Sequence, residues 1–376
     1  MTLEKLSNTI AKTLAAKPTI GIEITTTSGC NCNCAYCFES SHQFTRDIEE
    51  ENRQIALLEE YCSKDFNLQK NNDIMITFWG GEPMMNLDYV KRIIEATIKY
   101  DFVRYYMYTN GTLLDAFKDL AKCKWADELK KRIHIQLSYD GEPHNAIKRG
   151  EFSSKMVIKT AEFLKNAGFE VSFKATLSFD MLSKLPEIWK SYLDLRERLG
   201  SFVQYAPTLD MTTSDQTALD EWRDGLKEVM KLEYDLWKKT KGPPLLAHLS
   251  SMTHKRVCDM RGTVLMHNDG NFYLCHGCAY LDDSKKKNLV LGNTKENSIA
   301  EVLSKTREVK FDEKNKDCQR CPATWCTTCH AMSVDPANYQ DDWIKCISSD
   351  KVRCKFFKIF ATLARAFQAS KFCWPR

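Results

Sequence analysis

The chain has 376 residues, which is enough for a sizeable core and more than one domain. Its net charge is only +4, from 54 basic and 50 acidic side chains, and this balance excludes a dedicated nucleic-acid-binding protein. Hydrophobic residues make up 43% of the chain, which excludes a disordered protein. Because we find no apolar run of membrane-spanning length and no signal peptide, we expect a cytoplasmic protein without a membrane span.

Apolar β-type runs alternate with helical patterns in the first two-thirds of the chain. The expected strands are 19–27, 73–79, 103–109, 132–140, 170–179 and 201–207. Helical spacing between them predicts a parallel sheet with right-handed crossovers. Six such units are too few to close an eight-unit barrel. We therefore predict an α/β fold, a partial (β/α)6 TIM-like barrel with its site at the carboxyl ends of the strands.

The pattern changes after Pro207. A long amphipathic helix is expected over 215–239, and the Gly-Pro-Pro run at 242–244 marks a boundary. From about Cys258 the chain is cysteine-rich and poorly periodic, as expected of a region built around metal. At 351–372 helical spacing returns, and we favour a helix docked on the core over a membrane-surface or partner helix. The expected organisation is an N-terminal segment 1–17, a barrel 18–240, a linker 241–255, a cysteine-rich domain 256–348 and a C-terminal helix 349–376.

The first cysteine group lies in the loop after the first expected strand. Cys30, Cys34 and Cys37 form the spacing C-x3-C-x2-C, with Cys32 inside it. In a reducing compartment such tight spacing indicates metal rather than disulfides. Structural zinc usually has four ligands in two pairs, whereas three thiolates suit a four-iron cluster that leaves one iron open to a ligand.

A Gly-Gly-Glu-Pro turn follows the second expected strand, at residues 80–83. By itself it is an ordinary strand-exit turn. The two glycines, however, allow the backbone to approach a ligand closely, and Glu82 can act as an anionic acceptor. Since the turn lies one βα unit after the cysteine loop, we expect the two motifs to form one site.

Together these motifs resemble the radical S-adenosylmethionine (SAM) superfamily, whose signature is C-x3-C-x2-C with an aromatic residue before the last Cys, followed by Gly-Gly-Glu-Pro. The resemblance implies that Cys30, Cys34 and Cys37 hold three irons of a [4Fe–4S] cluster whose fourth iron binds the methionine moiety of SAM. It also implies SAM contacts from Tyr36, near the adenine, and from Gly80, Gly81, Glu82, Asn110, Ser138, Lys174, Thr176 and the backbone near Ala206.

The chemistry implied by this resemblance belongs to the cofactor. A reductant such as flavodoxin or ferredoxin supplies an electron, SAM is cleaved, and the resulting 5′-deoxyadenosyl radical takes a hydrogen from the substrate. The protein's own task is to bind, orient and exclude side reactions.

In the second cysteine region, the block at 318–329 contains two CxxC pairs, a strong metal signal that fits either zinc or iron–sulfur. Its order, C-x11-G-x4-C, then C-x2-C-x4-C-x2-C and one further Cys, resembles the SPASM domain, although the last two gaps of the block are each one residue shorter. The resemblance implies two auxiliary [4Fe–4S] clusters, and so three clusters in all. Auxiliary cluster I would use Cys258, Cys275 and Cys329, with Cys278 or an open site as the fourth position, and auxiliary cluster II would use Cys318, Cys321, Cys326 and Cys346.

Auxiliary clusters in this family accompany oxidation of polypeptides, so the first expectation is a maturase that forms a crosslink, such as a thioether, C–C or C–O bond, in a ribosomally made peptide. A separate leader-binding protein or the cleft between barrel and SPASM domain would present that peptide. The alternative is an anaerobic sulfatase-maturing enzyme that forms formylglycine. That branch carries an Asp after the Cys of the G-x4-C element, where this chain has His276, a candidate catalytic base.

A third possibility from another class is a non-catalytic iron–sulfur electron carrier. The turn at 80–83 discriminates between the two classes, because a carrier has no use for a methionine-binding turn.

Overall fold

The computed structural model describes residues 19–37, 46–64, 73–200, 203, 205–209, 218–246, 262–279, 286, 289–308 and 351–372. None of the helices in these ranges is both long and apolar enough to cross a lipid bilayer. The chain folds around one continuous sheet whose strands follow the order β6-β5-β4-β3-β2-β1-β7-β8-β9.

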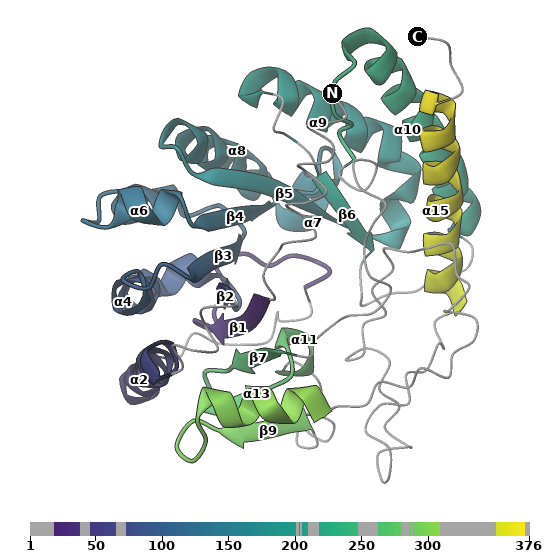
Figure 1. Cartoon of the computed structure of the whole chain (residues 1–376). Coiled ribbons are helices and arrows are strands. Elements are labelled where there is room, and N and C mark those ends of the chain that lie inside the picture. Colours follow the sequence, from purple (N-terminus) through teal and green to yellow (C-terminus); the bar gives the residue numbers. More distant parts are fainter. Residues whose placement is uncertain are drawn as a thin grey trace.

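The first six strands are parallel and neighbour one another in sequence order, which confirms the predicted partial barrel. Helices cover the outer side of the arc that they form (Figure 1). The strands are β1 (Thr19–Thr25), β2 (Asp73–Trp79), β3 (Val103–Thr109), β4 (Ile133–Ser138), β5 (Glu170–Leu177) and β6 (Tyr205–Leu209). The helices between them are α2 (Ile48–Lys64), α4 (Leu87–Thr97), α5 (Leu114–Leu120), α6 (Ala126–Lys130), α7 (His144–Arg149), α8 (Glu151–Asn166) and α9 (Leu185–Leu199), with 3-10 turns η1 (Pro83–Asn86) and η2 (Phe179–Lys184).

The sixth strand differs from its expected position. It begins at Tyr205 and continues through Pro207 to Leu209, whereas the sequence pattern ended it at Pro207. β6 lies at the edge of the sheet, and an edge strand tolerates a proline because one of its sides needs no ladder hydrogen bonds.

Burial alternates along the barrel strands. In β3, Val103, Tyr105 and Met107 are buried in the core, while Tyr106 and Tyr108, which alternate with them, are half-buried. β4 and β5 show the same period of two, with apolar residues in the core and polar residues on the other face. The inner face of the arc, the barrel lumen, therefore carries polar and aromatic side chains.

The C-terminal region extends the sheet of the barrel. Strand β7 (Thr263–Met266) pairs in parallel with β1, and β8 (Asn271–Tyr273) and β9 (Val290–Asn293) continue as antiparallel strands. Helices α11 (His276–Ala279) and α13 (Ile299–Glu308) belong to the same region (Figure 1). The boundary expected near residue 256 thus separates two stretches of sequence that share one sheet.

The C-terminal helix α15 (Lys351–Phe372) packs along α10 (Leu219–Thr240), as Figure 1 shows. Phe360 and Phe367 are buried, and the ring of Phe360 meets that of Trp222 at a centroid distance of 6.1 Å. These contacts agree with the helix docked on the core that the sequence favoured.

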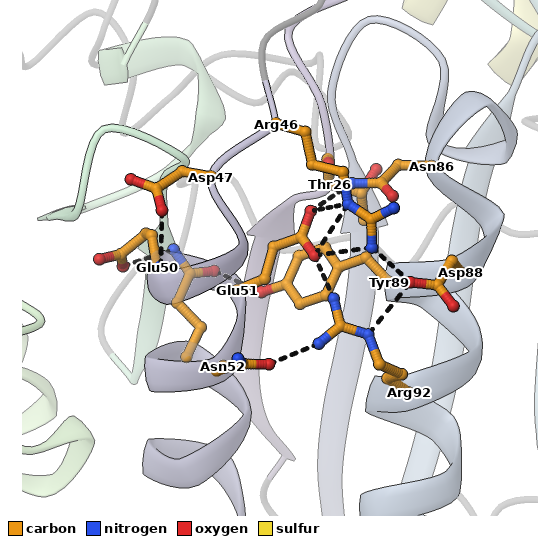
Figure 2. A network of polar contacts seen from close by, with 11 residues as sticks. Thr26, Arg46, Asp47, Glu50, Glu51, Asn52, Asn86, Asp88, Tyr89 and Arg92 are labelled. Carbon is orange, nitrogen blue, oxygen red and sulfur yellow. Dashed lines mark hydrogen bonds and ion pairs between the residues drawn. The ribbon is translucent and has the colours of Figure 1, made fainter.

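A buried polar network joins α2 and α4 (Figure 2), and Glu50 extends it to the C-terminal strands. Glu51 accepts from Asn86 at 2.8 Å and pairs with Arg46 and Arg92. Its neighbour Glu50 accepts from Thr294 Oγ1 at 2.8 Å, close to β9. Both glutamates are almost fully buried, so these bonds offset a large desolvation cost.

We predict that Glu50→Ala destabilises the protein by roughly 2–4 kcal/mol, because it leaves the buried donors of Gln54 and Thr294 without their acceptor. Glu59→Ala on the same helix is the matched control. Glu59 forms an exposed ion pair with Lys99, worth about 1 kcal/mol or less. Thermal unfolding measured without oxygen compares the two, and equal shifts in Tm would contradict a structural role for the network.

Candidate functional site

The cysteine loop leaves the carboxyl end of β1 and is bound by backbone hydrogen bonds to the turn after β2. The Gly81 amide donates to Thr27 O and the Glu82 amide donates to Gly29 O, both at 2.9 Å. The two motifs that the sequence assigned to one site are therefore in direct contact.

The glycines of the turn are required by this contact. A Cβ atom on Gly80 would lie 2.2 Å from Thr27 O, and one on Gly81 would lie 2.4 Å from Gly29 O. Gly80 also has a φ of +131°, which side chains of L-residues rarely adopt. Sequence analysis assigned these glycines to the approach of a ligand. In the structure, the groups that approach these glycines closely are backbone atoms of the cysteine loop.

Glu82 is fully buried and links the ends of β2 and β3. Its Oε1 accepts from Thr109 Oγ1 at 2.7 Å and from the Met84 amide at 3.0 Å, and its Oε2 accepts from the Asn110 amide at 2.7 Å. Burial raises the pKa of the carboxyl group to about 7 against the lowering effect of these donors. The carboxylate thus already has three protein donors, and a role as acceptor for the SAM ammonium stays a prediction.

Asn110 lies beside the first cysteine. Its Nδ2 atom is 3.7 Å from Cys30 Sγ and donates to Asn31 Oδ1 at 2.9 Å. Its Oδ1 accepts from the Thr112 amide, which fixes the orientation of the side chain. The structure therefore brings the end of β3 to the cysteine loop, and the SAM contact expected of Asn110 stays a prediction.

Two thiols of the loop, those of Cys30 and Cys34, favour the ionised form that binds metal. Cys32 hydrogen-bonds to its neighbours and lowers the pKa of Cys30 to about 6 and that of Cys34 to about 7, although burial opposes both shifts. Thiolates are the ligands of iron–sulfur clusters, so the donor set fits such a group. Within the described ranges, no three His, Cys, Asp or Glu side chains are close enough to hold one metal ion, and Cys37 does not complete such a group.

Tyr36 is held by two residues of the fourth βα unit. Its hydroxyl donates to Asp140, and Arg149 Nη1 donates to the same hydroxyl at 3.0 Å. Asp140 is fully buried, and its other oxygen accepts from the Thr176 amide at 2.8 Å. Burial and the negative charge of Asp140 raise the pKa of Tyr36. Sequence analysis missed Arg149, because no motif accompanies this residue at the end of α7.

The remaining predicted SAM contacts, Ser138, Lys174, Thr176 and Ala206, lie within β4, β5 and β6. Ser138 is paired in register with Lys174, and Lys174 with Ala206, so these residues stand side by side across three strands. The Lys174 side chain extends over the ring of Tyr108, with Nζ 5.8 Å from the centroid.

His276 connects the C-terminal region with the barrel lumen. Its amide and Nδ1 both contact Glu23 Oε2, at 2.9 and 3.0 Å, and its ring stacks on Trp79 at 3.7 Å. Burial acts to raise the pKa of Glu23, but the charge and hydrogen bonds of His276 outweigh it and lower that pKa. Sequence analysis missed Glu23 and Trp79, although an acid within the apolar strand at 19–25 was a signal.

The described cysteines of the second region are Cys275 and Cys278. Both are buried, and their sulfur atoms are 3.8 Å apart. The pair matches two of the ligands predicted for auxiliary cluster I. The other predicted auxiliary ligands lie outside the described residues: Cys258, Cys318, Cys321, Cys326, Cys329 and Cys346.

Two family models match the chain. The model of the radical SAM superfamily matches residues 24–188, and the SPASM model, an iron–sulfur cluster-binding domain, matches residues 258–322. These matches imply SAM and [4Fe–4S] clusters, auxiliary clusters among them, as the cofactors.

Curated relatives of the chain include a sulfatase-maturating enzyme and a cyclopropyl synthase. The chain is 23% identical over 328 residues to the cysteine-type anaerobic sulfatase-maturating enzyme of Clostridium perfringens strain 13, covering 78% of this chain and 83% of that enzyme. It is 29% identical over 174 residues to the radical SAM cyclopropyl synthase TigE of Paramaledivibacter caminithermalis, covering 42% of this chain and 35% of TigE.

Solved structures share the fold. The enzyme anSMEcpe with bound AdoMet and the Cp18Cys peptide matches with a TM-score of 0.64 and 16% identity, over 94% of this chain and 100% of that one. Streptococcus suis SuiB bound to its precursor peptide SuiA matches with a TM-score of 0.54 and 14% identity, over 91% of this chain and 79% of SuiB.

We predict that Gly81→Ala displaces the cysteine loop, since its methyl group would clash with Gly29 O, and overpacking of this kind costs roughly 1–3 kcal/mol. The iron content of protein purified without oxygen should fall. Gly168→Ala is the control, because its φ of +86° gives backbone strain while the nearest atom to the added Cβ is 3.9 Å away. Equal iron in Gly81→Ala and wild type would contradict the prediction.

Proposed function

Because the chain belongs to the radical SAM superfamily and carries a SPASM domain, we propose that it is a maturase that forms an oxidative crosslink in a ribosomally made peptide. The observation that carries the proposal is the pairing of β7 with β1. It brings His276 of the C-terminal region against Glu23 of β1 and Trp79 of β2, the two strands that lead into the cysteine loop and the Gly-Gly-Glu-Pro turn. A peptide side chain in the lumen would face both regions at once.

The proposed cofactor site lies at the carboxyl ends of the barrel strands. Cys30, Cys34 and Cys37 would hold the [4Fe–4S] cluster. SAM would bind across the rim formed by Tyr36, Gly80, Gly81, Glu82, Asn110, Ser138 and Thr176 and by the backbone near Ala206. When bound, the cluster and SAM would supply one-electron cleavage of SAM and abstraction of a hydrogen atom from the substrate. The chain itself makes the rim rigid, because the Asn110 amide donates to Glu82 and the Asn110 side chain contacts Cys30 of the cysteine loop.

His276 is the proposed acceptor for the proton that the oxidised substrate must also lose. Glu23 holds its Nδ1, and the stack on Trp79 fixes the plane of the ring. An oriented imidazole of this kind suits general-base chemistry. For auxiliary cluster I we propose the ligands Cys258, Cys275, Cys278 and Cys329. For auxiliary cluster II we propose Cys318, Cys321, Cys326 and Cys346.

Sulfatase maturation is the second candidate. The match to the Clostridium perfringens enzyme extends over most of both chains, which supports this candidate as strongly as the SuiB fold supports the first. His276, at the position where that branch carries an Asp, is the reason that we place peptide crosslinking first. In either case the proposed substrate is a polypeptide.

We predict that Cys34→Ala abolishes SAM cleavage while Cys32→Ala retains it. The reason is that Cys34 is a proposed cluster ligand, whereas Cys32 only hydrogen-bonds to its neighbours. The measurement is 5′-deoxyadenosine formed from SAM with dithionite, together with iron and sulfide content. If both variants lose cleavage and iron alike, Cys32 is a ligand and the proposed register is wrong.

The product distinguishes the two candidates. Wild-type enzyme should remove two hydrogens from a short precursor peptide encoded beside its gene, and tandem mass spectrometry should locate the new bond between two residues. A sulfatase peptide with one Cys or Ser at its modification site is the comparison substrate. An aldehyde that forms a hydrazone on that peptide, with no change in the precursor, would reverse our order of preference.

A further inference from the structure

Three side chains on adjacent strands face the barrel lumen: Tyr108 of β3, Gln136 of β4 and Lys174 of β5. Tyr108 is paired in register with Gln136, and Lys174 is two residues beyond Ser172, the partner of Gln136. All three alternate with core residues along their strands and so face inward. None of them contacts the cysteine loop in the described part of the chain.

Lys174 is a cation without an anion. The Lys174 ammonium lies over the ring of Tyr108. In the described part of the chain, no carboxylate pairs with this ammonium. Burial alone lowers the pKa of this amine, so the protein bears the cost of desolvation without a compensating charge. Such a group favours a ligand that brings a negative charge into the lumen.

Gln136 adds an unused acceptor beside this cation. Its Oε1 atom is buried and has no hydrogen-bond donor among the described residues. A buried acceptor in this state costs free energy, which a donor on a bound ligand would recover. One cation and one acceptor on neighbouring strands fit a ligand that carries both a carboxylate and an N–H group, as an acidic residue of a peptide does.

The depth of these groups separates them from the proposed SAM rim. Asn110 lies two residues after Tyr108, and Ser138 lies two residues after Gln136. Two residues of a β-strand span about 6.6 Å, so Tyr108 and Gln136 lie one inward-facing layer below the rim. Lys174 starts level with Ser138, but its side chain reaches over Tyr108 in the deeper layer.

We propose that Lys174 and Gln136 form a substrate subsite near the residue that is modified, in which the Lys174 ammonium binds the carboxylate of an Asp or Glu side chain and Gln136 Oε1 accepts from a backbone N–H of the same peptide. This assignment deepens the proposed function and rests on it, since it presumes a polypeptide in the lumen. It also reassigns Lys174, which sequence resemblance grouped with the SAM contacts, from the cofactor to the substrate.

The test uses the anaerobically prepared holoenzyme with SAM and two synthetic probes, the amidated and acetylated tripeptides Gly-Glu-Gly and Gly-Gln-Gly. Saturation-transfer NMR compares their binding without any need for turnover. Wild type should prefer the Glu peptide about tenfold or more, because a hydrogen-bonded charge pair contributes on that scale. Lys174→Met should abolish this preference and Lys174→Arg should retain most of it.

Lys190→Met, which removes an exposed lysine of α9, is the matched control and should leave the preference intact. Equal binding of the two peptides by wild type, or an unchanged preference in Lys174→Met, would overturn the proposal. A tenfold loss of SAM affinity in Lys174→Met, measured by equilibrium dialysis with labelled SAM, would also overturn it and return the residue to the cofactor. Failure of wild type to cleave SAM is a separate result that would count against the proposed function itself.

Discussion

The backbone contact between the loop after β1 and the turn after β2 is the constraint on which the candidate site depends. Amides of Gly81 and Glu82 donate into the cysteine loop, and neither glycine of the turn has room for a Cβ atom. The start of the cysteine loop is therefore positioned by a second strand exit, while Asp140 and Arg149 hold its far end at Tyr36. Glu82 extends the constraint to β3, because its buried carboxylate accepts from Thr109 and Asn110.

Strand β1 has a second partner, β7, and this pairing decides how the C-terminal region meets the barrel. It puts Glu23 opposite the start of α11. There one carboxylate oxygen of Glu23 accepts from the His276 amide and also contacts His276 Nδ1. The buried network around Glu50 and Glu51 supports the same junction from the helical side. Since buried ion pairs contribute little net stability but are costly to break, the network favours one arrangement of the two regions over others.

The lumen shows how the same strands serve two purposes. One face of each strand is apolar and packs under the helices, and the other carries groups that the protein leaves partly unsatisfied, such as Lys174 and Gln136. A folded protein keeps such groups where a ligand compensates them. In the proposed subsite, the depth of the barrel, as well as its rim, selects the substrate.

The sequence by itself determined the six parallel units, the cysteine spacing and the Gly-Gly-Glu-Pro turn, because strand periodicity and short motifs are local properties of the chain. Only the tertiary structure decided that β7 joins β1, that Arg149 and Asp140 hold Tyr36, and that Glu23 and Trp79 orient His276. These contacts join residues up to 253 positions apart, and no local pattern encodes such a pairing. The tertiary structure also explains the two glycines of the turn, because folding brings the backbone of the cysteine loop against them.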